Sequence, residues 1–242
     1  MRTIAIIQAR MGSDRVKGKV LKDLGGKSVL ERVIERTKKA KCVDEVVIAT
    51  TENSSDDPII MKARELGVLV HRGSEYDVLD RYMGAALKFK ADIVFRITAD
   101  CPFIDPQMIE FVMENFSDGV YDYASNRINR TYPRGQDTEI ITIEALEKNW
   151  TEAKEKYQRV HVTPYVYENP DKFKICSVYG AKDFSHQRWT VDTDDDIRFL
   201  RKVCEEFDVD TMGWEALAIA LERRPDILGL NAHVVQRSMR DV

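Results

Sequence analysis

A basic, glycine-containing loop follows the first apolar run of the sequence. Residues 9–19 hold four cationic side chains and two glycines: Arg10, Arg15, Lys17, Lys19, Gly12 and Gly18. Glycine lets backbone N–H groups approach phosphate oxygens, while arginine forks and a lysine point charge neutralise negative charge. The loop therefore indicates a polyphosphate site, although its composition alone leaves open an ordinary solvated basic loop.

This loop matches neither of two common phosphate-binding patterns. The dinucleotide fingerprint G-x-G-x-x-G is absent. A Walker loop is also disfavoured, because five residues separate Gly12 from Gly18 and Val20 stands where Ser or Thr is required. These departures argue against a dinucleotide oxidoreductase and against a P-loop ATPase.

Two aspartates follow apolar runs elsewhere in the chain. Asp100 comes after the run at residues 92–98, and Asp192 comes after Arg188-Trp189-Thr190-Val191. Magnesium is usually bound through one or two carboxylates together with substrate phosphates, so the pair could hold it. Taken alone, both residues could equally be helix caps or turn residues, and residues 194–196 are expected to be caps and solvated charges.

The second half of the sequence gathers a mixed polar cluster. Residues 126–139 combine three arginines with Asp137, Glu139 and Tyr132, and His161 follows later. Arginine can grip a carboxylate through two parallel hydrogen bonds, so this mixture could bind a sugar acid. A surface hairpin with mixed charges and a core histidine is the alternative that stays open.

The elements that must position these residues are predicted from apolar periodicity. Apolar runs predict buried strands at residues 3–8, 45–51, 67–70 and 92–98, and helical patterns lie between them. Helix starts are indicated by a capping box at Ser28 and by prolines after Asp57 and Asp105. Four βα units over residues 1–116 predict a parallel sheet with helices on both faces, whose ligands bind at the carboxyl ends of the strands.

The remaining chain loses this regular alternation. We expect strands at residues 121–126, 138–143 and 173–178, a helix from Glu144, and an amphipathic helix that carries Ile197, Leu200, Val203 and Phe207. No long linker or repeat divides the chain, so one domain is predicted over residues 1–242. In it, residues 1–120 form the nucleotide-binding βα units, and residues 121–242 supply acceptor binding and C-terminal helices. The predicted fold is an open, mostly parallel, Rossmann-like α/β sheet with a small α+β C-terminal subregion.

Composition excludes several other classes of protein. The 37 Lys and Arg are scattered among 41 Asp and Glu, which disfavours nucleic acid and anionic membrane surfaces as partners. Four cysteines without a CxxC pair fit a reducing compartment. No apolar run approaches the roughly 20 residues of a spanning helix, so we expect a cytoplasmic protein.

Several motifs resemble those of one enzyme family. The run Gln8-Ala9-Arg10-Met11-Gly12-Ser13, with Arg15 and Gly18-Lys19-Val20-Leu21, resembles the nucleotide loop of sugar cytidylyltransferases of the spore coat polysaccharide biosynthesis protein F type. These are related to the synthetases of CMP-3-deoxy-manno-octulosonate and CMP-sialic acid. The resemblance continues through residues 45–57, 72–74, 77–81, 96–102, 132–135, 161–165 and 188–193 and covers about the first 200 residues. Val16-Lys17 departs from the usual Leu-Pro, which removes no phosphate ligand.

The resemblance implies an activity and a set of residue roles. It implies a nucleotide-diphospho-sugar transferase-like fold and a homodimer that uses magnesium to transfer CMP from CTP to a sugar or keto-sugar acid, with release of pyrophosphate. The implied catalytic residues are Arg10, Arg15, Lys19 and Asp100, and the implied magnesium ligands are Asp100 and Asp192. The implied nucleotide-binding residues are Gln8, Ala9, Arg10, Met11, Gly12, Ser13, Lys19, Thr50, Thr51, Ser74 and Asp80. The implied acceptor-binding residues are Arg134, Asp137, Glu139 and His161.

Two other functions use a similar sheet. A nucleotide-sugar glycosyltransferase would transfer the sugar and release a nucleoside diphosphate, and a noncatalytic CTP-binding protein would keep the fold without turnover. The basic loop after the first strand favours a triphosphate, because its charge would be excessive for a diphosphate sugar.

Overall fold

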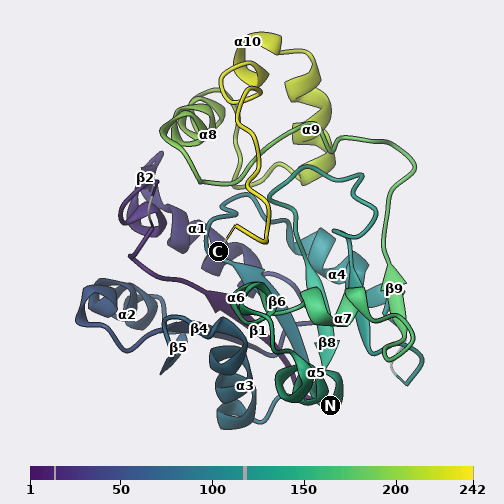
Figure 1. Ribbon diagram of the computed structural model, residues 1–242. Helices are drawn as coiled ribbons and strands as arrows, with labels where there is room; N and C mark the ends of the chain where they lie inside the picture. Colours follow the sequence, from purple (N-terminus) through teal and green to yellow (C-terminus); the bar gives the residue numbers. More distant parts are fainter. Residues whose placement is uncertain (14, 117–118, 242) are drawn as a thin grey trace.

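A seven-stranded sheet forms the centre of the molecule (Figure 1). The computed structural model describes residues 1–13, 15–116 and 119–241, so Asp14 of the basic loop lies outside the described residues. The strand order is β5-β4-β1-β6-β8-β7-β9. The strands are β1 (Thr3–Gln8), β4 (Glu45–Thr51), β5 (Leu69–Gly73), β6 (Ile93–Thr98), β7 (Tyr123–Ser125), β8 (Glu139–Thr142) and β9 (Ile175–Ser177).

The sheet has a parallel half and a mixed half. Strand β1 pairs in parallel with both β4 and β6, and β4 pairs in parallel with β5. Strand β8 runs antiparallel to β6 and β7, while β9 runs parallel to β7. The prediction of a mostly parallel α/β sheet is confirmed.

Helices cover both faces of this sheet, as predicted (Figure 1). Residues of α1, α2 and α4 pack in one apolar cluster with β1 and β6, and residues of α3 and α5 pack in a second cluster on the opposite face. The helices are α1 (Val29–Lys38), α2 (Asp57–Glu65), α3 (Val78–Phe89), α4 (Pro106–Asn115), α5 (Ile143–Glu152), α6 (Lys156–His161), α7 (Pro164–Glu168), α8 (Asp194–Glu206), α9 (Trp214–Glu222) and α10 (Pro225–Leu228). Short 3-10 turns η1 (Lys19–Leu21) and η2 (Ser54–Asp56) and the hairpin β2 (Asp23–Leu24) and β3 (Lys27–Ser28) complete the described elements.

Local signals fixed several helix starts. The capping box predicted at Ser28 is present, because its hydroxyl accepts from the Glu31 amide and the Glu31 carboxylate accepts from the Ser28 amide. Pro106 begins α4, and Asp105 caps it by accepting from the Gln107 amide at 2.8 Å. These contacts fix the residues at which α1 and α4 begin.

Five of the predicted strands differ from the structure at a boundary, and two of these differences have a visible local cause. The strand expected at residues 67–70 begins only at Leu69, because the amides of Gly67 and Val68 bond back to carbonyls of α2. The strand expected at 121–126 ends at Ser125, where the side-chain amide of Asn126 donates to the Gln136 carbonyl and its oxygen accepts from the Thr138 amide. Side-chain hydrogen bonds therefore accompany a long backbone contact, from the Asn126 amide to the Thr138 carbonyl at 3.4 Å, where the strand ends.

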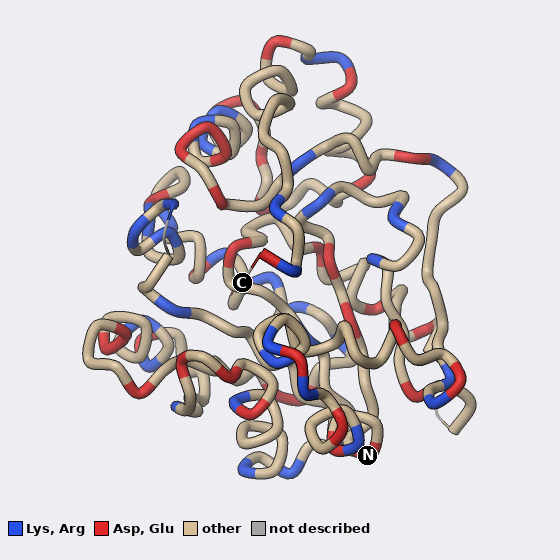
Figure 2. The backbone as a smooth tube through the Cα atoms, viewed as in Figure 1, with Lys and Arg blue, Asp and Glu red and all other residues tan. Residues whose placement is uncertain are grey.

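The last helices share a core with segments from the first half of the chain. Apolar residues of α8, α9 and α10 form a third cluster with Leu24, Val29 and Phe103, around the fully buried Trp189. In Figure 2, Lys and Arg are interspersed with Asp and Glu over the backbone trace. None of the described helices has the length and apolar character that crossing a membrane would require.

Candidate functional site

Three separate segments meet at the carboxyl ends of β1 and β6. These strands are neighbours in the sheet, so the loop that follows β1 lies beside Asp100, which follows β6. The segment before α8 joins them, because the Val191 amide donates to the Asp100 carbonyl at 2.8 Å and the Thr190 hydroxyl donates to the same oxygen at 3.1 Å. Asp192 is thereby held next to Asp100.

Lys19 connects these segments through its ammonium group. Its Nζ donates to Asp100 Oδ2 at 2.8 Å, to Asp192 Oδ1 at 2.9 Å and to the Val191 carbonyl at 2.7 Å. Gly18, with φ of 64°, supplies the left-handed turn that begins η1. The structure therefore brings together Lys19, Asp100 and Asp192, which are far apart in the sequence.

The charges of this cluster stabilise one another. Burial disfavours the Lys19 ammonium, but Asp100 and Asp192 outweigh it and raise the pKa of Lys19 to about 12. Burial likewise disfavours the Asp100 carboxylate, and the charge and hydrogen bond of Lys19 lower its pKa to about 2. Near neutral pH the pair is fully ionised, so Lys19 acts as a fixed positive charge and not as a proton acceptor.

Two arginines hold Asp192 from its other sides. Arg15 lies 3.1 Å from Asp192 Oδ1, and Arg188 donates to Asp192 Oδ2 at 2.7 Å. Arg188 also donates to Asp196 Oδ1 at 2.8 Å. Asp196 is the third residue of the capping box of α8, as expected of a cap, but it is fully buried. Its predicted solvation is wrong, because Arg188 and the Asn231 amide enclose its carboxylate.

The start of the basic loop is anchored by Asp56, which sequence reasoning missed. Its carboxylate accepts from the Met11 amide at 2.7 Å and from the hydroxyls of Thr50 at 3.1 Å and Thr51 at 2.5 Å. Burial opposes the charge, but these hydrogen bonds lower the pKa of Asp56. The side chains of Thr50 and Thr51 are buried and already bonded to Asp56. Their predicted nucleotide contacts stay predictions.

The other predicted nucleotide residues of the loop lie at varying depths. The Gln8 side-chain oxygen accepts from Arg96 at 3.2 Å, and Ala9 is buried. Arg10 and Gly12 are exposed, and Ser13 is half-buried. Exposed backbone at Gly12 beside exposed Arg10 is the arrangement that a phosphate ligand requires.

Ser74 and Asp80 are used in local contacts. The Ser74 hydroxyl accepts from the Asp77 amide at 3.1 Å, just before α3. The Asp80 carboxylate accepts from the indole of Trp150 at 2.9 Å, which links α3 to α5. Both residues therefore have structural partners, and their predicted nucleotide contacts stay predictions.

Glu139 lies at the centre of a buried charge network on the acceptor side. It is 1% exposed, it is paired with Arg96, and it accepts from Arg127 at 2.7 Å. The hydroxyls of Tyr123 and Thr163 also donate to it. Burial raises the pKa of Glu139, but the two arginines and the hydroxyls lower it to about 2. Protein donors surround the carboxylate, so it positions Arg127 and has little capacity left for a substrate hydroxyl.

Arg134 and Asp137 are placed differently. Asp137 accepts two hydrogen bonds from Arg130, at 2.5 and 2.9 Å. The Arg134 guanidinium makes no hydrogen bond or ion pair with another residue within the described ranges, and burial and the neighbouring Arg130 lower its pKa. Such a guanidinium can accept an anionic ligand.

The backbone beside Arg134 explains how this segment reaches the site. Gly135 has φ of 113°, and a Cβ there would come within 2.6 Å of the Trp189 carbonyl oxygen. The Trp189 amide donates to the Arg134 carbonyl at 2.6 Å, which ties the acceptor segment to the segment that carries Asp192. The two predicted halves of the site are therefore joined by direct backbone contact.

His161 also lies in this region. Burial, together with the charges of Arg96 and Arg127, lowers its pKa to about 4, so the imidazole is neutral near neutral pH. Its Nε2 is buried, and no protein partner lies within hydrogen-bonding distance among residues 1–13, 15–116 and 119–241. A buried ring nitrogen without a partner fits a ligand hydroxyl.

The carboxylates fit the chemistry of a magnesium site. The described residues hold no cluster of three or more His, Cys, Asp or Glu suited to a metal. Asp100 and Asp192 nevertheless direct one oxygen each toward a single cation, the Lys19 ammonium. Two carboxylates completed by substrate phosphates are an ordinary donor set for magnesium.

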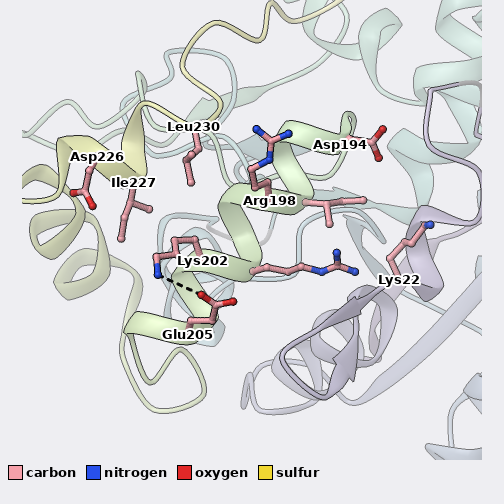
Figure 3. A pocket seen from close by; sticks show the side chains of 10 residues that line it. Lys22, Asp194, Arg198, Lys202, Glu205, Asp226, Ile227 and Leu230 are labelled. Carbon is pink, nitrogen blue, oxygen red and sulfur yellow. Dashed lines mark hydrogen bonds and ion pairs between the residues drawn. The ribbon is translucent and has the colours of Figure 1, made fainter.

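A cavity of about 600 Å³ lies away from these residues (Figure 3). It is lined from α8 and α10 and by Lys22, and it includes none of the predicted site residues. Two of its charged side chains, Lys202 and Glu205, pair with each other at 3.3 Å. We therefore place the functional site at the convergent polar groups beside β1 and β6.

Comparison with known proteins identifies a family. A family model described as cytidylyltransferase matches residues 4–217 of the chain. The chain belongs to the cytidylyltransferase family. It is 32% identical over 234 residues to the spore coat polysaccharide biosynthesis protein SpsF of Bacillus subtilis, with 91% of this chain and 94% of that protein covered.

Solved structures of cytidylyltransferases share the fold. The structure of a cytidylyltransferase from Leptospira borgpetersenii superposes with a TM-score of 0.91 at 34% identity, covering 98% of this chain and 100% of that one. A CMP:2-keto-3-deoxy-manno-octonic acid synthetase complexed with CTP gives a TM-score of 0.67 at 18% identity, covering 85% and 99%. At that identity the second likeness concerns the fold alone.

Proposed function

We propose that the chain is a magnesium-dependent cytidylyltransferase that transfers CMP from CTP to a hydroxyl of a sugar or keto-sugar acid and releases pyrophosphate. The observation that carries this proposal is the meeting of Lys19, Asp100 and Asp192 beside the loop after β1, in a member of the cytidylyltransferase family. The relatives support the substrate class, because one is named for polysaccharide biosynthesis and another, 38% identical over 112 residues, is a 3-deoxy-manno-octulosonate cytidylyltransferase.

The nucleotide side supplies positive charge where the leaving group develops negative charge. The acceptor hydroxyl oxygen forms a bond to the α-phosphorus as the bond from that phosphorus to the oxygen that bridges it to the β-phosphorus breaks. Pyrophosphate leaves with the bonding electrons, and the hydroxyl proton passes to solvent. Arg10, Arg15 and Lys19 bind the triphosphate and stabilise this charge. Because Lys19 and Arg15 are held by Asp100 and Asp192 before the reaction, little reorganisation of these two groups is needed in the transition state.

Asp100 and Asp192 would hold magnesium. When bound, the metal would neutralise phosphate charge and orient the phosphate oxygens. The chain's own contribution is to hold both carboxylates aimed at one point, which Arg15, Arg188 and the Val191–Asp100 backbone contact achieve.

The acceptor side binds and orients the sugar. Arg134 has an available guanidinium for an acceptor carboxylate, and His161 has an available ring nitrogen for a hydroxyl. Asp137 fixes Arg130 beside them. Glu139 contributes indirectly, by holding Arg127.

A pyrophosphate-release assay tests the proposal. Each of the four ribonucleoside triphosphates is tested with magnesium against keto-sugar acids and neutral sugars, with and without a metal chelator. We expect release only with CTP, only with one class of acceptor and only without chelator. Nucleoside diphosphate release from a nucleotide sugar would favour the glycosyltransferase, and CTP binding with no turnover for any acceptor would favour the noncatalytic protein.

The oligomeric state is part of the same proposal. The homodimer implied by family resemblance predicts a mass near twice 27.9 kDa in light scattering. A mass of one chain at micromolar concentration would contradict it.

A further inference from the structure

The segment that follows α10 returns to the acceptor side of the site. The Asn231 amide anchors its beginning, donating to Asp196 Oδ1 at 3.0 Å and to the Arg188 carbonyl at 2.9 Å. From there the yellow trace in Figure 1 runs back from α10 toward the sheet and ends near its centre. We call residues 236–240 the strap.

The strap contacts groups that face the acceptor region. Arg188 donates to the Gln236 side-chain oxygen at 2.7 Å. The Met239 sulfur accepts from the Tyr167 hydroxyl at 3.3 Å and lies 3.9 Å from an Arg127 nitrogen. Arg127 and Tyr167 are therefore both in contact with one strap side chain.

The far end of the strap is held by an aromatic ring. The Arg240 guanidinium lies 5.4 Å from the centre of the Tyr157 ring on α6. The strap thus extends from Arg188, which holds Asp192, to the helix that ends at His161. This path crosses the region to which we assign the acceptor.

The strap supplies only weak hydrogen-bond acceptors to the guanidinium groups of Arg127 and Arg188. A thioether sulfur is a weak acceptor and an amide oxygen is uncharged, whereas a carboxylate would form shorter and roughly twice as strong bonds with guanidinium groups. Gln236 and Arg240 are exposed and Met239 is only half-buried, so little apolar surface fixes the strap in place. An acidic ligand can therefore compete with these contacts.

We propose that the strap covers the acceptor side in the free protein and that the carboxylate of an acidic acceptor displaces it from Arg127 and Tyr167. This inference rests on the proposed function, because it takes the acceptor side as assigned above. A protein whose binding-competent state is only partly populated binds its ligand with an affinity reduced by that fraction. The strap therefore weakens acceptor binding and leaves CTP binding unchanged.

Calorimetry on full-length variants tests the displacement. The test variant carries Gln236→Ala and Met239→Ala, and the matched control carries Val235→Ala and Arg237→Ala, at exposed neighbouring positions. The ligands are 3-deoxy-manno-octulosonate and N-acetylneuraminate, with mannose as the uncharged comparison and CTP titrated separately. Loss of weak contacts that together are worth about one ordinary hydrogen bond predicts about fivefold tighter binding of an acid to the test variant alone.

The other outcomes contradict the strap. Weaker acid binding to the test variant would make Gln236 and Met239 part of the acceptor site, and equal binding would show that they do not compete. Failure of both acids to bind either protein would overturn displacement by a keto-sugar acid. An equal gain for mannose would show that charge has no role.

Proteolysis gives a readout that needs no turnover. Trypsin cleaves after Arg237 and Arg240, and a bound acid that displaces the strap accelerates both cuts in the wild-type chain. Slower cutting would mean that the segment closes over bound acceptor, which overturns displacement. If acid binding releases the strap while no pyrophosphate forms with any acceptor, the proposed function fails and the strap inference stands.

Discussion

Each side of the site contains a cluster of ion pairs. The open cluster consists of Lys19, Asp100 and Asp192, and the closed cluster consists of Glu139, Arg96 and Arg127. The Lys19 side chain is 15% exposed between Asp100 at 25% and Asp192 at 13%. Glu139 is 1% exposed between Arg96 at 7% and Arg127 at 22%. The difference teaches that charge alone does not mark a binding residue: the open cluster can exchange partners for a ligand, whereas the enclosed Glu139 carboxylate of the closed cluster maintains the structure.

The position of each cluster in the sheet explains this difference. Lys19 and Asp100 follow the ends of strands, where backbone leaves the sheet and solvent enters. Glu139 is the first residue of β8, and it lies directly opposite Arg96 inside β6 and Ser125 on β7. A cross-strand pair inside the sheet is covered by helices, so its charges must satisfy each other.

The largest expected effect is on stability, at Glu139. Glu139→Gln removes the negative charge and leaves two arginines in the closed cluster without it, so the free energy of unfolding should fall by about 3 kcal/mol. Urea denaturation measures this. The matched control Glu144→Gln, exposed on α5, should change the value by about 0.5 kcal/mol or less. Equal losses in both variants would contradict the distinction between closed and open clusters.

Lys19→Ala should have the opposite effect, a large loss of turnover in a chain that stays folded. Removal of one preorganised positive group should reduce turnover by on the order of 100-fold while the chain stays folded. Steady-state pyrophosphate release and circular dichroism check both parts. Lys17→Ala, an exposed lysine of the same loop, is the control and should retain near wild-type turnover. Wild-type turnover in Lys19→Ala would remove Lys19 from the mechanism. Asp100→Ala should also lose turnover while it stays folded, and wild-type turnover in that variant would remove Asp100.

Acid should destabilise the closed cluster through Glu139. Its pKa is depressed to about 2 from the ordinary value of 4.5, so its contribution to stability is fully present above about pH 4.5 and is lost as pH falls toward 2. Glu139→Gln lacks this contribution at every pH. Between about pH 4.5 and about pH 2, the free energy of unfolding should therefore change less with pH in Glu139→Gln than in the wild type. The two slopes should differ by up to about 1.4 kcal/mol per pH unit. Parallel stability curves would place the proton on another group.

Arg134→Ala sharpens the comparison within the acceptor side. Unlike Arg127, Arg134 has no ion pair with a described residue, so its loss should leave urea stability nearly unchanged. The KM for an acidic acceptor should rise about tenfold, the loss expected for one charge-assisted hydrogen bond, and the KM for CTP should stay the same. Arg134→Lys keeps the charge without the fork and should recover only part of the affinity. A matching rise in the KM for CTP would place Arg134 on the nucleotide side.

The parallel half of the fold was predictable because its signals are local. Residues 3–8 and 45–51 are strands with the predicted limits, and the capping box at Ser28 begins α1 as expected. The basic loop and Asp100 could be found for the same reason, since ligand groups follow strand ends in such sheets.

The closed cluster and the partners of Asp192 were not predictable in this way. Arg188, Asp196 and Asn231 meet across 43 residues, and no local pattern records that they touch. Glu139 reads as a polar residue near a strand start, and only the register of β8 against β6 shows that Arg96 lies opposite it. Asp56 had one usable signal, its place just before Asp57-Pro58 at a helix start, but its hydrogen bond to the Met11 amide required the fold.

The smallest expected effect concerns Asp80, where family resemblance implies a nucleotide contact and the structure shows a structural one. Its carboxylate accepts from the Trp150 indole on the exposed surface, and an asparagine oxygen can accept the same bond. Asp80→Asn should therefore change the KM for CTP by less than about twofold, because exposed contacts of this kind contribute little. Trp150→Phe, which removes the donor, is the matched variant and should behave alike. A large rise in the KM for CTP in Asp80→Asn alone would show that the carboxylate leaves Trp150 to bind nucleotide, and the open region would then extend to the start of α3.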